Sequence, residues 1–195
     1  LPDISYVIGK PGHSALHCVL AAVDETIKTN VIDEDNIGLI GHSFGGFETT
    51  YIISQTNRFK TAVAGAGVTD LLSFYLDIDS SSLSNMERFE NSQFRNKIPF
   101  TEDKFLLESP IMNVKTINTP LLLWTGDSDK MVDPSYSIKM YAALWRLQKK
   151  STLLTYPQEE HVLINPANQQ NLTTKIMNWF DHYLKGAPKE TWINN

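Results

Sequence analysis

The sequence has 195 residues, of which 42% are hydrophobic and 20% are charged, a composition typical of a single globular domain with a real core. Its net charge is −5 and its basic residues are scattered, which excludes the positive footprint of a nucleic-acid-binding protein. Apolar runs such as Val19–Val23 and Leu121–Trp124 are far shorter than the roughly 20 residues that cross a bilayer. The sequence therefore predicts neither a nucleic-acid partner nor a membrane span.

The first residues and the single cysteine add little about location or chemistry. Leu1–Ser5 show neither the basic nor the apolar region of a secretory signal, so this end indicates no compartment. Cys18 has no partner for an internal disulfide, and its apolar helical neighbours predict a buried thiol. The spacing of the histidines does not match a metal site, and we expect no metal or other cofactor.

Helix and strand patterns alternate through the first part of the chain, as in an α/β fold with a parallel sheet. Apolar residues at helical spacing predict a helix over residues 14–28, with Ser14 as its N-cap. A short apolar run predicts a buried strand at 36–42, and helical character returns from Phe44. The next predicted strand covers residues 61–66.

The second half of the chain continues the same alternation. Strands are predicted at 120–125 and 152–156, with a helix over 135–147 between them. Apolar residues from Leu172 to Tyr183 indicate a closing helix, and Gly186 suits its C-cap. The pattern predicts one α/β domain over residues 1–195, without internal repeats.

An irregular stretch interrupts this alternation at about residues 76–109. It is rich in serine, asparagine and charged residues and has little periodicity. We expect a surface insertion within the domain, of the kind that often shapes access to a site.

The segment Gly41–Gly46 reads G-H-S-F-G-G and fits the G-x-S-x-G nucleophile elbow, in which a strained turn between strand and helix exposes a serine. A strand is predicted before it and a helix after it, as the motif requires. We expect an unfavourable backbone conformation at Ser43 and close packing at both flanking positions, Gly41 and Gly45. The alternative is a glycine-rich loop in which Ser43 is only a helix N-cap.

A serine nucleophile needs a base, and only two histidines follow Ser43. His182 lies within the closing helix, where an exposed surface histidine is the simpler interpretation. His161 lies in a loop just after a predicted strand. It is therefore the better candidate for the base.

The base needs a carboxylate partner between Ser43 and His161 in an α/β-hydrolase. The loop after the third strand offers Asp127, Asp129 and Asp133. Asp127 follows the glycine that turns the chain, which favours a role in the turn itself. Asp133 precedes a proline, which favours an extended or capping position. Asp129 lies at the centre of the loop, but the residues alone do not rank the three.

A tetrahedral intermediate needs hydrogen-bond donors for its oxyanion. The backbone amide of Phe44, the residue after the nucleophile, supplies the first. The second donor comes from a loop after an earlier strand in this type of fold, and no such strand precedes Ser14.

These motifs together resemble the catalytic domain of the prolyl oligopeptidase family. The resemblance is carried by the elbow at Gly41–Phe47, Ser109-Pro110 before a T-P-L-L-L strand, the loop Gly126–Val132 and the segment Tyr156–His161, and it extends from about Pro11 to the C-terminus.

The resemblance implies an α/β-hydrolase fold, a parallel sheet with helices on both faces. The family's G-x-x-D-x-x-V loop and Y-P-x-E-x-H segment imply Asp129 as the acid and His161 as the base. The implied reaction is hydrolysis of peptide bonds through an acyl-enzyme intermediate. An apolar pocket for the residue before the cleaved bond is implied at Phe44, Val68, Leu71, Phe74 and Val132, residue types that are equally typical of core packing.

The family also has a β-propeller, further N-terminal strands and an oxyanion tyrosine that this sequence lacks. We therefore expect residues 1–195 to be a partial domain, impaired in isolation and prone to self-association through an exposed sheet edge. An esterase or lipase, and a catalytically silent binding module, are the alternative functions.

Overall fold

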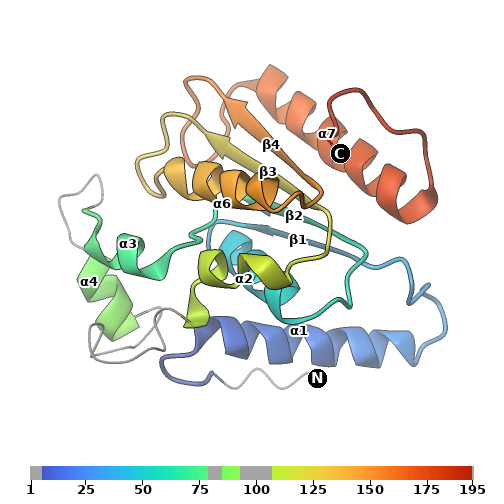
Figure 1. Ribbon diagram of the computed structural model, residues 1–195, viewed down its shortest axis with the longest axis horizontal. Helices are drawn as coiled ribbons and strands as arrows, with labels where there is room; N and C mark the ends of the chain where they lie inside the picture. The colour runs from blue at the N-terminus through green and yellow to red at the C-terminus, as the bar shows by residue number, and fades with distance from the viewer. Residues whose placement is uncertain (1–5, 79–84, 93–106, 195) are drawn as a thin grey trace.

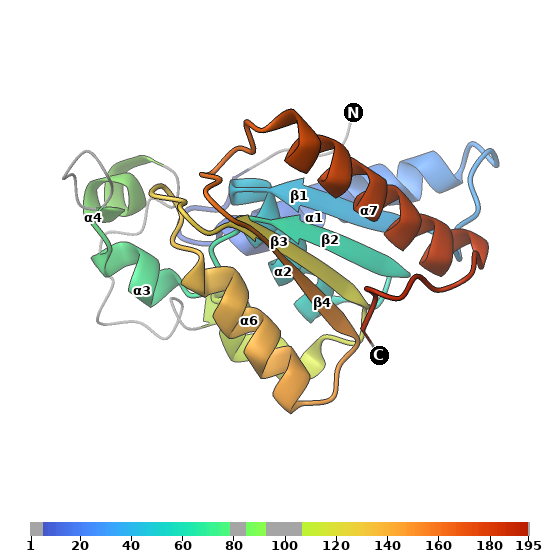
Figure 2. The same ribbon diagram turned by 90° about the horizontal axis from the view of Figure 1, so that it is seen from above.

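The computed structural model describes residues 6–78, 85–92 and 107–194. Its centre is a parallel four-stranded sheet in the order β1-β2-β3-β4 (Figures 1 and 2). The strands are β1 (Gly38–His42), β2 (Thr61–Gly65), β3 (Leu121–Gly126) and β4 (Ser151–Tyr156). All four lie within two residues of their predicted positions, and the α/β-hydrolase fold class is confirmed.

Helices connect successive strands, as parallel pairing requires. The four longer helices match predicted ones, while the short helical turns were not predicted. The helical elements are α1 (Pro11–Ile27), α2 (Phe44–Gln55), α3 (Leu71–Leu76), α4 (Asn85–Glu87), the π-helical turn η1 (Arg88–Ser92), the 3₁₀ helix η2 (Pro110–Thr116), α6 (Ser135–Arg146) and α7 (Pro166–Lys185).

The two faces of the sheet are covered by different helices (Figure 2). On one face, Ile53 of α2 and Met140 of α6 pack against Ala64 and Leu123 of the sheet. On the other face, α7 packs its buried Trp179 into a cluster that includes Val63, Leu122 and Trp124. α1 lies outside α2 and covers it through a separate apolar cluster. Neighbouring residues of β2 and β3 point to opposite faces of the sheet, and both faces are apolar, so helices pack on each side.

The structure corrects the predicted start of α1 and the predicted burial of Cys18. The helix begins at Pro11, three residues before the predicted start, because proline suits the first helical position. Ser14 therefore lies inside the helix, where its Oγ donates to the carbonyl of Lys10 (2.8 Å) and accepts from the N–H of Val7 (2.8 Å). Cys18 is partly exposed rather than buried, because its face of α1 is not fully covered by the described residues.

The closing helix ends as predicted. Gly186 follows α7 in the left-handed conformation (φ 70°), which glycine adopts without steric cost. His182 is half-buried rather than exposed, because its Nδ1 is hydrogen-bonded to the carbonyl of Ala187 (2.8 Å) just beyond this cap. No helix among the described residues is long and apolar enough to cross a membrane.

Most of the insertion predicted at 76–109 lies outside the described residues, and it stays a prediction. Its last described part is anchored by Glu108, which is buried. The Glu108 carboxylate accepts the N–H groups of Gly12 (2.9 Å) and His13 (3.2 Å) at the start of α1 and the hydroxyl of Tyr51 (3.1 Å). Burial raises the pKa of Glu108, although these donors oppose the shift.

Candidate active site

The carboxyl ends of the strands bring three separate loops to one edge of the sheet. The register pairs His42 with Gly65 and Gly65 with Trp124, and it pairs Gly126 with Tyr156. Ser43 directly follows β1, while the loops after β3 and β4 carry the other two candidate residues. This is the edge at which open α/β sheets place their ligands.

The turn at Ser43 has the strained backbone that the elbow motif predicts. Ser43 has φ 58° and ψ −119°, a conformation that costs a non-glycine residue free energy, and its N–H donates to the carbonyl of Gly65 (2.8 Å). A Cβ at Gly41 would lie 2.0 Å from the carbonyl oxygen of Gly45, so glycine is required there.

The expectation of close packing at the second flanking glycine is wrong. A Cβ at Gly45 would meet nothing within 4 Å, because this position faces outward from the first turn of α2. The tight contact is one residue later: a Cβ at Gly46 would lie 2.6 Å from the carbonyl oxygen of Gly65 and 2.9 Å from the Cα of Gly67. The elbow is thus pressed against β2 through Gly46.

Ser43, His161 and Asp129 form one continuous chain of contacts. His161 Nε2 lies 2.7 Å from Ser43 Oγ, and His161 Nδ1 lies 2.8 Å from Asp129 Oδ2. The second carboxylate oxygen, Oδ1, accepts the backbone N–H groups of Met131 (2.8 Å) and Val132 (2.9 Å). The side chain of Asp129 is fully buried and that of His161 is 12% exposed, so the contact between these two residues is largely shielded from water.

Proton positions follow from the chemistry of the partners. An ionised carboxylate only accepts, so the ring of His161 carries its proton on Nδ1 and donates it to Asp129. Nε2 then has a lone pair and accepts the hydroxyl proton of Ser43. This is the arrangement that general-base activation of a serine requires.

The loops that carry the acid and the base are locked to each other. Gln158 N–H donates to Asp127 Oδ1 (2.7 Å), and Ser128 N–H donates to the carbonyl of Glu159 (2.9 Å). A Cβ at Gly126 would lie 2.2 Å from that same carbonyl oxygen, so glycine permits the close approach. Asp127 therefore ties the two loops together, and Asp133 accepts the N–H of Ser135 at the start of α6 (2.8 Å).

Glu159 is a site-supporting residue that sequence reasoning missed. Its side chain is buried and accepts the N–H groups of Ile164 (2.7 Å) and Asn165 (3.1 Å) and the side-chain amide of Asn168 (2.7 Å). The hydrogen bond from Asn168, with those from the two backbone groups, lowers the pKa of Glu159. A carboxylate two residues before His161 thus fixes the path of the chain after it; the acidic pair in Y-P-Q-E-E-H was the only sequence signal.

A cavity of about 210 Å³ opens beside Ser43. Four of the five residues expected around an apolar pocket line it, together with Ser43, Arg88 and Met131; these four are Phe44, Val68, Phe74 and Val132. Leu71 is the exception. Its side chain is 1% exposed and packs within the core cluster around Phe47 and Tyr51, because the N-terminal turn of α3 directs it inward.

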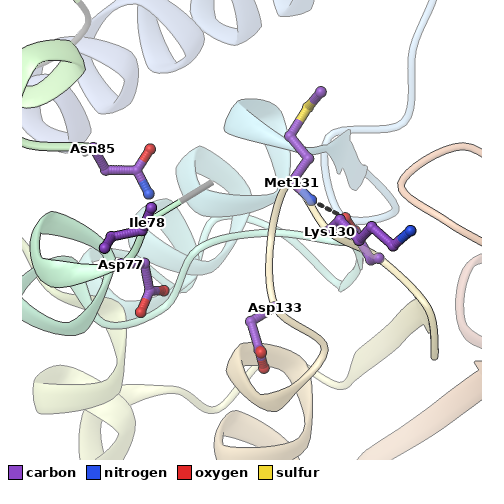
Figure 3. A pocket seen from close by; sticks show the side chains of 7 residues that line it. Asp77, Ile78, Asn85, Lys130, Met131 and Asp133 are labelled. Atoms are coloured by element: carbon purple, nitrogen blue, oxygen red, sulfur yellow. Dashed lines mark hydrogen bonds between the residues drawn. The ribbon is translucent and has the colours of Figure 1, made fainter. Parts of the chain in front are cut away.

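A second cavity, of about 360 Å³, lies on the other side of the loop that follows Asp129. Figure 3 shows Asp77, Ile78 and Asn85 facing the segment Lys130–Asp133 across it. Met131 lines both cavities, so this loop separates an acidic hollow from the largely apolar one beside Ser43.

Comparison with known proteins assigns the family. A family model described as the prolyl oligopeptidase family matches residues 6–187. The chain belongs to this family. It is 30% identical over 93% of its length to an uncharacterized peptidase (YuxL) of Bacillus subtilis, of which it covers 27%. It is 29% identical over 91% of its length to the acylamino-acid-releasing enzyme of Arabidopsis thaliana, of which it covers 24%.

Solved structures confirm the fold. The acylaminoacyl peptidase of Pyrococcus horikoshii superposes on 94% of this chain with a TM-score of 0.84 at 20% identity, and the matched part is 30% of that protein. A puromycin-hydrolyzing peptidase of Mycobacterium tuberculosis gives a TM-score of 0.81 at 23% identity over 95% of this chain and 28% of its own. The chain spans about a quarter of the length of the two curated relatives.

Proposed function

We propose that the chain is the catalytic part of a serine peptidase that hydrolyses peptide bonds through an acyl-enzyme intermediate. The observation that carries this proposal is the contact chain from Ser43 Oγ through the ring of His161 to the buried carboxylate of Asp129. Family membership supports a peptidase, and the relatives whose names state an activity are peptidases or acylamino-acid-releasing enzymes. We further propose that residues 1–195 form one unit within a larger catalytic domain.

In the proposed mechanism, Ser43 Oγ attacks the substrate carbonyl while His161 Nε2 takes the hydroxyl proton. The bond from Oγ to carbon forms, and the carbonyl electron pair moves to oxygen. Asp129 holds the ring in the required tautomer and offsets the charge of the imidazolium. The carbonyl then re-forms and the C–N bond breaks as His161 gives its proton to the leaving amine, which leaves the acyl group on Ser43. Water, deprotonated by His161, attacks this ester in the same way, and the bond from Oγ to carbon breaks to release the acid and Ser43.

The oxyanion of the intermediate needs donors beside Ser43. Phe44 is the first residue of α2 and follows Ser43, so its N–H lies at the N-terminus of a helix, where the helix dipole favours negative charge. Its amide is the proposed oxyanion donor. The side chains of Phe44, Val68, Phe74 and Val132 are proposed to receive an apolar side chain before the cleaved bond, since they line the cavity next to the nucleophile.

Labelling with a fluorophosphonate tests the proposed nucleophile. We expect the full-length natural protein to react at one serine, and the modified peptide to contain Ser43. Digestion and mass spectrometry identify the site. Labelling of a different serine, or none, would count against the triad; turnover of esters with no turnover of peptide amides would favour an esterase instead.

We also propose that the 195-residue chain self-associates through β1. This strand is at the edge of the described sheet, and Ile40 on it is 56% exposed, which is the pattern of a strand open to pairing. Ile40→Lys should shift the chain toward monomer in size-exclusion chromatography with light scattering, because an edge lysine opposes pairing. Ile138→Lys on α6 is the matched control, since Ile138 is 45% exposed and belongs to a helix away from this edge. Equal behaviour of both variants, or a monomeric parent chain, would contradict the proposal.

A further inference from the structure

His42, the residue before the proposed nucleophile, reaches across the site to the main chain of the proposed base. Its Nε2 lies 2.8 Å from the backbone carbonyl oxygen of His161. A carbonyl only accepts, so the ring of His42 donates from Nε2. The two rings lie with their centroids 4.8 Å apart, without a hydrogen bond between them among the contacts of the described residues.

The ring of His42 is also held in place by the sheet. It stacks on the indole of Trp124, with centroids 5.1 Å apart and an interplanar angle of 6°. Trp124 is on β3, two residues before Gly126, and it lies against β2 because Gly65 has no side chain: a Cβ there would lie 2.1 Å from the indole. The indole of Trp124, on which His42 stacks, is therefore fixed by β3, which carries it, and by β2, against which it packs; we call it the Trp124 platform.

We propose that His42 is a positioning residue, which ties the backbone of His161 to the Trp124 platform and so fixes the imidazole within reach of Ser43. One side chain then links strands β1 and β3 to the loop that follows β4. The contacts of Asp127 and Glu159 hold the same loop at other places. Asp127 accepts the N–H of Gln158, before His161, and Glu159 accepts the N–H of Ile164, after it. The inference rests on the proposed function, since it assigns His42 a role in activating the same serine.

The surroundings of His42 suit a neutral donor. A cavity of about 270 Å³ beside it is lined by Trp124, Val162, Leu163, Gln169, Leu172 and Thr173, none of them charged. The charged or titratable groups that act on His42 are His161 and Asp129. Partial desolvation and, to a lesser extent, His161 lower the pKa of His42, although the residue is exposed on one side and the hydrogen bond and Asp129 oppose the shift. A neutral ring adds no second positive charge beside His161 when His161 becomes an imidazolium.

Two substitutions in the full-length protein separate positioning from packing. His42→Gln keeps an N–H at a similar reach from the main chain but loses the aromatic stack, whereas His42→Phe keeps the stack but loses the donor. We expect His42→Phe to lower kcat by about tenfold with KM unchanged, because a misplaced base weakens the chemical step and not binding. His42→Gln should stay within about threefold of the parent.

The readouts are peptide turnover and the rate of fluorophosphonate reaction, both expressed per titrated Ser43 so that unfolded molecules do not count. The reaction rate at Ser43 should fall in His42→Phe and recover in His42→Gln. A parent-like rate in His42→Phe, or the reverse order of the two variants, would overturn the positioning role while leaving the proposed function intact. A parent protein that neither labels at Ser43 nor cleaves peptides would instead overturn the proposed function, and this inference with it.

Discussion

Asp129→Asn is expected to lower kcat by about 10⁴-fold with little change in KM, as the same substitution does in serine proteases with this constellation. The reason lies in the two backbone donors. Oδ1 of Asp129 accepts the N–H groups of Met131 and Val132, which would hold the single oxygen of an asparagine in that place. The amide NH₂ would then face His161 Nδ1 and donate to it. The proton of the imidazole would move to Nε2, and no lone pair would be left for the hydroxyl of Ser43.

The same loop provides two matched controls. Asp127→Asn and Asp133→Asn change the same chemical group, and each side chain accepts a backbone N–H that an asparagine oxygen can also accept. We expect both variants to remain within about threefold of the parent in kcat. Steady-state kinetics on a peptide substrate in the full-length protein would measure all three. A loss at Asp127 or Asp133 comparable to that at Asp129 would mean that the acid is misassigned.

The order of the larger elements was predictable because each depends on local periodicity. Apolar runs gave all four strands, and helical spacing gave α1, α6 and α7, since each buries one apolar face. Helix α2 was expected only from the helical character that follows the elbow, because its buried residues lie on most of its sides and form no single apolar stripe. The short elements α3 and η2 have too few turns to show a period. The N-terminal boundary of α1 was missed because Ser14 looks like a cap when its actual partners, Lys10 and Val7, are not known to be near.

The candidate site was predictable where a motif carries the chemistry. The elbow around Ser43 requires a particular backbone turn, and the segments around Asp129 and His161 resemble family motifs that place them. Contacts between distant segments left no such signal. Leu71 and Val68 are apolar residues three positions apart in the same core cluster, and only the fold decides that Val68 also lines the cavity while Leu71 does not.

Gly41→Ala is expected to destabilise the fold by about 3 kcal/mol, at the upper end of the usual cost of overpacking. A Cβ at Gly41 would lie 2.0 Å from the carbonyl oxygen of Gly45 and 2.6 Å from Oγ1 of Thr49. The first contact is with backbone, which cannot move away unless the first turn of α2 unwinds. Since this turn also sets the position of Ser43, kcat should fall by about 10²-fold in the molecules that still fold.

Gly45→Ala tests whether this cost comes from the contact or from the loss of a glycine in the elbow. A Cβ at Gly45 meets nothing within 4 Å, and alanine is favoured over glycine within a helix by about 1 kcal/mol. Urea unfolding followed by tryptophan fluorescence should therefore show a lower midpoint for Gly41→Ala and an unchanged or higher one for Gly45→Ala. If both variants lost stability equally, the elbow would need glycine at both positions for its backbone freedom. A loss confined to Gly41→Ala would instead mean that the fit between β1 and the first turn of α2 is what holds Ser43 in its strained conformation.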